Sequence, residues 1–100
     1  MPVSLADALD AVRRSLAHGW SQHGCRDASG FGCVDDVAHT FDLVGAVERH
    51  AGPFRLAVWD RLDEATDGTS YLWSLEPGRT HQEVLALVAR ATKRAEQEAA

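Results

Sequence analysis

Apolar residues recur every three or four positions along most of this chain, which is the spacing of one face of an α-helix. The first such stretch predicts a helix over residues 5–17, with Ser4 as its N-cap and Asp7 at the positive end of the helix dipole. Gly19 predicts a left-handed residue that ends this helix, so that Trp20 folds back onto its last turn.

The widest apolar stripe predicts a second, central helix over residues 34–50. Asp35 and Asp36 would lie at its N-terminal end, where carboxylates are favourable, and residues 51–53, Ala-Gly-Pro, would stop it. A third helix is predicted over residues 53–65.

Residues 69–75 alternate between apolar and polar side chains, which predicts a short extended segment. Because no second strand is evident, we expect this segment to cross the helices as an extended arm. Thr80 then opens the last helix, and Glu83 three residues later completes a capping box.

These patterns predict a mainly α fold, a single small domain over residues 1–100 of about four helices with one short extended segment before the last helix. We expect residues 1–3 and 95–100 to be frayed. A hydrophobic content of 45% and a charged content of 25% are ordinary for a globular domain. The predicted core consists of Leu9, Val12, Leu16, Val37, Phe41, Val44, Val47, Val58, Leu62, Val84, Leu87 and Val88.

Acidic residues are concentrated in the middle of the chain. Residues 34–76 hold nine carboxylates and three arginines, and the formal net charge of the chain is −5. This balance does not favour nucleic acid as a partner, but it suits a surface that meets a basic protein. No apolar run is long enough to span a membrane and no signal peptide is recognisable, so we expect a cytoplasmic protein.

The stretch from residue 18 to residue 33 concentrates chemically reactive side chains between the first two helices. By residue type, His18 and four further side chains in and after this stretch could bind Zn²⁺. The candidate site consists of those four, namely His23, Cys25, Cys33 and His39. Their spacing lacks the close cysteine pairs typical of zinc sites, so the simpler interpretation is two free cysteines and no cofactor.

Two further hypotheses concern the same cysteines. Cys33 lies at a predicted helix N-terminus, which would favour a reactive thiolate and a small thiol enzyme, although Asp35 and Asp36 oppose this effect. Cys25 and Cys33 could alternatively form a disulfide, which a cytoplasmic setting disfavours.

Aromatic side chains are the other candidates for function. The simpler interpretation of these residues is that they fill the core, since aromatic rings bury large areas. Trp59 and Tyr71 fall off the main apolar stripes, however, and the alternative is that they form part of a contact surface. The residues predicted to take part in an interaction are Trp20, His23, Arg26, Trp59, Tyr71 and Trp73.

The C-terminal part of the chain resembles a family of small actinobacterial and actinophage proteins, the domain of unknown function 6197. The resemblance rests on Trp73, residues 77–80 (Pro-Gly-Arg-Thr) and residues 83–91 (Glu-Val-Leu-Ala-Leu-Val-Ala-Arg-Ala), with Gly19-Trp20 and Cys33 matching earlier positions. The family's tryptophan is usually followed by Asn-Asp, where Ser74 and Leu75 stand here. The resemblance implies a shared fold and an origin in actinobacteria or their phages, and it implies no activity.

The chain carries none of the glycine-rich phosphate loops, His-Glu-x-x-His pairs or Gly-x-Ser-x-Gly elbows that mark common enzyme classes. The leading prediction is therefore a non-catalytic protein-interaction or regulatory domain, with a homodimer as its simplest form. The alternatives are a zinc-binding domain through residues 18–39 and a thiol enzyme at Cys33.

Overall fold

The computed structural model of the chain describes residues 2–24, 32 and 40–99. Within these ranges the backbone forms five α-helices and one short 3₁₀ helix, which confirms the mainly helical class. None of these helices is long and apolar enough to cross a membrane. The elements are α1 (Leu5–His18), α2 (Leu43–His50), η2 (Gly52–Phe54), α3 (Arg55–Thr66), α4 (Ser70–Ser74) and α5 (His81–Ala99).

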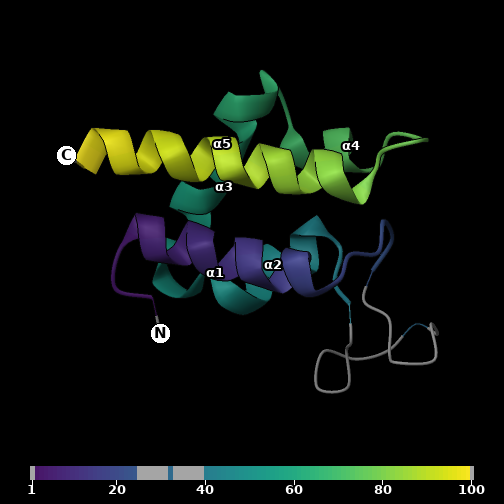
Figure 1. Cartoon of the computed structure of the whole chain (residues 1–100), viewed down its shortest axis with the longest axis horizontal. Coiled ribbons are helices and arrows are strands. Elements are labelled where there is room, and N and C mark those ends of the chain that lie inside the picture. The colour runs from purple at the N-terminus through teal and green to yellow at the C-terminus, as the bar shows by residue number, and fades with distance from the viewer. Residues whose placement is uncertain (1, 25–31, 33–39, 100) are drawn as a thin grey trace.

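The two longest helices, α1 and α5, lie side by side along the long axis and run in opposite directions (Figure 1). Their ends are joined by a contact of 2.5 Å between Nε2 of His81 and the carbonyl oxygen of Leu16. Since a carbonyl oxygen only accepts, Nε2 donates in this contact. α2 and α3 complete the core, whose largest fully buried side chains are Leu9, Leu16, Leu43, Leu62, Leu87, Val12, Val47, Val58, Val84 and Val88.

The predicted ends of the first and last helices are largely confirmed. The backbone N–H of Asp7 donates to Oγ of Ser4 at 3.1 Å. At the start of α5, the N–H of Thr80 donates to Oε1 of Glu83 at 3.0 Å and the N–H of Glu83 donates to Oγ1 of Thr80 at 3.2 Å, which is the reciprocal capping box. The prediction of a left-handed conformation at Gly19 is wrong, because this residue has an extended backbone with φ 175° and ψ 150°.

The predicted central helix starts much later than expected. α2 begins at Leu43, because the carboxylate of Asp42 accepts the backbone N–H of Gly45 at 2.8 Å and caps the helix there. Just before it, Phe41 pairs with Trp20 in an isolated parallel bridge. The predicted helical residues 34–39, among them Val37 of the expected core, lie outside the described residues. Phe41 and Val44 are only partly buried.

The extended arm predicted over residues 69–75 is wrong, because Ser70–Ser74 form the short helix α4. Ser70 and Ser74 lie four residues apart on the buried face, while Tyr71 and Leu72 are exposed. The fully buried positions of α4 are thus held by small polar side chains, which hydropathy patterns do not detect, while Trp73 packs against the core from a partly buried position. At the C-terminus, α5 continues to Ala99, and Ala95 is buried within it.

Candidate functional site

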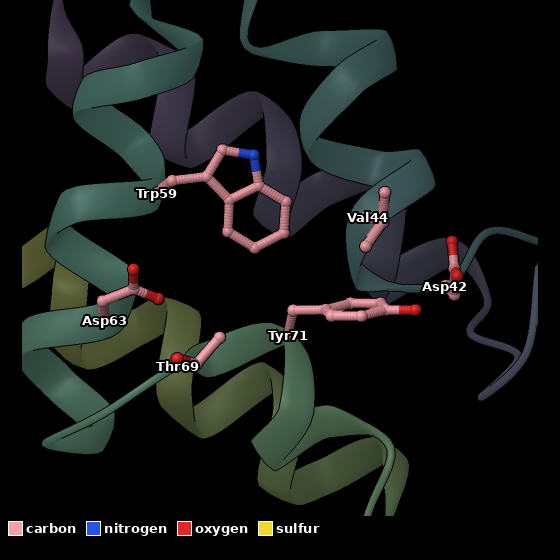
Figure 2. A pocket seen from close by; sticks show the side chains of 6 residues that line it. All are labelled: Asp42, Val44, Trp59, Asp63, Thr69 and Tyr71. Atoms are coloured by element: carbon pink, nitrogen blue, oxygen red, sulfur yellow. The ribbon is translucent and has the colours of Figure 1, made fainter.

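A pocket of about 460 Å³ opens between α2, α3 and α4. Figure 2 shows side chains from all three helices projecting around it. This volume lies in the range of small-ligand sites, and most of its wall is apolar. The residues that line it are Asp42, Val44, Trp59, Asp63, Thr69 and Tyr71.

Two aromatic rings form the apolar part of this pocket. Trp59 projects from α3, with its six-membered ring toward the pocket, and Tyr71 projects from α4, with its phenolic oxygen on the side where Asp42 lies (Figure 2). Trp59 packs partly against the core, whereas Tyr71 is 42% exposed. The structure therefore brings together the two aromatic residues that fell off the apolar stripes of the sequence.

Asp63 lines the pocket and also holds α4 in place. Its Oδ1 accepts the backbone N–H of Ser70 at 2.9 Å and the hydroxyl of Ser70 at 2.7 Å. The side chain of Thr69, the N-cap residue of α4, makes no capping hydrogen bond. A carboxylate from α3 therefore takes over the capping of α4 and fixes the position of Tyr71.

Asp42, on the opposite side of the pocket, has a similar double role. One carboxylate oxygen caps α2 through Gly45, and the other accepts the backbone N–H of Gly24 at 3.2 Å. A Cβ at residue 45 would lie 3.0 Å from both Oδ1 of Asp42 and the ring of Phe41, so a larger residue there would require these side chains to shift.

The described start of the 18–33 stretch is attached close to this pocket. The backbone N–H of Ser21 donates to the carbonyl oxygen of Phe41 at 3.1 Å. Nε2 of Gln22 donates to the carbonyl oxygens of Ser74 at 3.2 Å and Glu76 at 2.8 Å. Residues 20–24 therefore link the start of α2 to the end of α4.

The other predicted interaction residues lie elsewhere. The ring of Trp73 lies 3.9 Å below the guanidinium of Arg79, which covers it. Trp20 stacks on His81 with ring centroids 6.1 Å apart, and its buried indole N–H has no hydrogen-bond partner among the residues that the structure describes. His23 is exposed, and Arg26 lies outside the described residues.

The predicted metal and thiol sites fall mostly outside the described residues, since this is where Cys25, Cys33 and His39 lie. The proposed disulfide and the proposed Cys33 nucleophile fall there too. Within residues 2–24, 32 and 40–99, no three His, Cys, Asp or Glu side chains are grouped so that they could hold a metal ion.

A second hollow, of about 600 Å³, lies between α1 and the end of α2, and Asp7, Arg14, Arg49 and His50 are among its lining residues. Burial lowers the pKa of His50, and the charge of Arg49 lowers it further. Arg14 already pairs with Asp10 at 2.6 Å, and Asp7 adds a negative charge. The hollow therefore has mixed charge and no evident ligand preference.

The two carboxylates of the pocket are site residues that were not predicted from the sequence. Asp42 was assigned to the interior of a long helix, and its spacing from Gly45 is the local signal of an N-cap that could have placed it correctly. Asp63 acts on a residue seven positions further along the chain, in another helix, and carries no local signal.

Comparison with known proteins gives a family assignment. The model of a family of unknown function, DUF6197, matches residues 1–94. Neither the curated proteins nor the solved structures contain a match to the chain. Over nearly its whole length, then, the chain belongs to the DUF6197 family, as its C-terminal residues suggested.

Proposed function

We propose that this protein is a non-catalytic binding domain that recognises a basic segment of a partner protein in the pocket between α2, α3 and α4. The observation that carries the proposal is the convergence of Trp59 and Tyr71 with Asp42 and Asp63 around one pocket. Aromatic side chains with apolar neighbours dominate protein-binding hot spots, and acidic groups beside them select basic partners.

The charge around the pocket supports the choice of partner. Two acidic side chains, Asp42 and Asp63, line the pocket. Arg55 and Arg61, the nearby arginines on α3, form ion pairs with Glu48 and Glu98. Since no lysine or arginine is among the described residues that line the pocket, a basic segment would meet negative charge there.

The test is selection of 12-residue peptides on the immobilised protein, followed by affinity measurement with two surface variants. Tyr71→Ala removes one wall of the pocket, and Leu72→Ala is the matched control, because Leu72 is the next residue, is 62% exposed and does not line the pocket. We expect basic peptides to be selected, Tyr71→Ala to weaken their binding about tenfold or more, and Leu72→Ala to leave it unchanged.

Two results would overturn this proposal. One is selection of peptides without excess positive charge, or binding that Tyr71→Ala does not affect. The other is a dimer in sedimentation experiments that Tyr71→Ala converts to a monomer, because this would assign the surface to self-association. The cytoplasmic location and the actinobacterial or phage origin remain predictions from the sequence.

A further inference from the structure

The pocket combines two features that rarely suit the same ligand atom. Its aromatic and aliphatic walls, from Val44, Trp59 and Tyr71, favour an apolar group. Its carboxylates, Asp42 and Asp63, favour a cation with hydrogen-bond donors. A ligand that satisfies both needs an apolar stem and a charged end.

The hydrogen-bond pattern of Asp63 leaves it able to accept more donors. Oδ1 takes both bonds from Ser70, and Oδ2 accepts none from the described residues. A carboxylate oxygen offers two lone pairs, so a donor that enters the pocket could bond to this carboxylate, which is one of the lining groups.

The geometry distinguishes between the two basic side chains. A guanidinium is planar, stacks on aromatic faces, donates along a fixed fork and is weakly hydrated, whereas an ammonium is a compact and strongly hydrated point charge. The rings of Trp59 and Tyr71 offer faces for stacking beside a carboxylate (Figure 2). A long aliphatic stem would cover Val44 on the way in.

We infer that the pocket is a receptor for an arginine side chain, with the guanidinium between the two aromatic residues and its donors on Asp63, while the charge of Asp42 on the opposite side adds to the attraction. This inference rests on the proposed function, since it names the anchor residue of the basic partner.

The test uses blocked amino-acid amides as probes and the indole N–H signals of the protein in ¹H–¹⁵N NMR spectra as the readout. Trp59→Phe assigns the Trp59 signal. N-acetyl-arginine amide should shift this signal in the millimolar range, as expected for a fragment of this size on an open surface. N-acetyl-citrulline amide has nearly the same shape without the charge, and we expect it to bind about tenfold more weakly or worse.

The variants separate charge from structure. Asn keeps the acceptor oxygen with which Asp42 and Asp63 each cap a helix and gives up only the bond from the N–H of Gly24. The double variant Asp42→Asn/Asp63→Asn should therefore fold and bind the arginine probe about tenfold more weakly. The matched control, Asp60→Asn/Asp67→Asn, changes the net charge equally outside the pocket lining and should bind as the unaltered protein does.

Each failure has a distinct meaning. If citrulline or N-acetyl-leucine amide binds as tightly as the arginine probe, the arginine inference is wrong, while the Tyr71→Ala peptide test still decides the proposed function. If the arginine amide binds but a blocked Ala-Ala-Arg-Ala-Ala peptide does not, the pocket takes a free small cation, and both the side-chain assignment and the proposed partner are overturned.

Discussion

The pair formed by Asp63 and Ser70 offers the most direct test of how the pocket is built. Asp63→Ala removes the acceptor of two hydrogen bonds, one from the backbone N–H of Ser70 and one from its hydroxyl. Ser70 has no exposed surface, so water cannot replace the lost partner. α4 has only five residues and cannot hold itself in place by its own backbone hydrogen bonds.

The expected cost follows from these contacts. A hydrogen bond to a charged group contributes about 1.5–3 kcal/mol, and a buried donor left without a partner costs about 1–3 kcal/mol. We therefore expect Asp63→Ala to lower the free energy of unfolding by about 2–4 kcal/mol. Asp63→Asn, which keeps an acceptor oxygen, should cost about 1 kcal/mol. Ser70→Ala should cost less in the Asp63→Ala background than in the unaltered protein, because its hydroxyl has already lost its partner.

Urea unfolding at pH 7, followed by far-ultraviolet circular dichroism, measures all four terms of this cycle. Amide exchange of α4 should accelerate in Asp63→Ala before the protein unfolds globally, since the lost contacts attach this helix. A loss of less than about 0.5 kcal/mol in Asp63→Ala, or additive effects of the two substitutions within about 0.3 kcal/mol, would refute the role given to Asp63.

Three further predictions concern the core and the caps. Leu9→Ala leaves a cavity in a fully buried position of α1 and should lower the free energy of unfolding by about 2–5 kcal/mol in urea titrations, so a loss below 1 kcal/mol would contradict the packing described. Arg79→Lys keeps the charge but loses the stacking of the guanidinium on Trp73, so it should cost about 1 kcal/mol, seen as a drop of several degrees in the melting temperature. The pKa of Glu83 is lowered from its ordinary value of 4.5, chiefly by the hydrogen bond from the backbone N–H of Thr80. The charged carboxylate therefore stabilises the folded protein fully above pH 4.5, and this stabilisation is lost as the pH falls through the lowered pKa of Glu83 in the folded state. Glu83→Gln should therefore flatten the acid side of the stability profile, and an unchanged profile would contradict this assignment.

The sequence was sufficient to predict helix ends where the residues that interact there are close together in the chain. The Ser4 cap and the capping box of Thr80 and Glu83 each join residues three positions apart, and each lies where it was predicted. The core positions of α1 and α5 followed from helical spacing alone, because both helices bury one continuous stripe.

The errors occur where a distant residue decides the local backbone. Phe41 fitted the helical stripe of the second predicted helix, but it pairs with Trp20 instead, and Asp42 starts the helix after it. The alternation around Tyr71 predicted an extended segment, but a cap from Asp63 makes a helix of it. In both regions a tertiary contact overrides the local pattern, and the pocket is formed at these two places.

The carboxylates of the pocket serve both its lining and its structure. The carboxylates that line it are also the groups that hold its walls, because Asp63 attaches α4 and Asp42 caps α2 and fixes Gly24. A ligand that binds between Trp59 and Tyr71 requires α4 to be docked, so binding and docking are thermodynamically linked and each stabilises the other. A substitution that removes a carboxylate therefore confounds the loss of charge with the loss of a wall. At residue 63, replacement by asparagine keeps the one oxygen that caps α4 and exchanges the other carboxylate oxygen for an uncharged NH₂ group. The comparison of alanine with asparagine at residue 63 therefore separates the structural role of this side chain from its role in recognition.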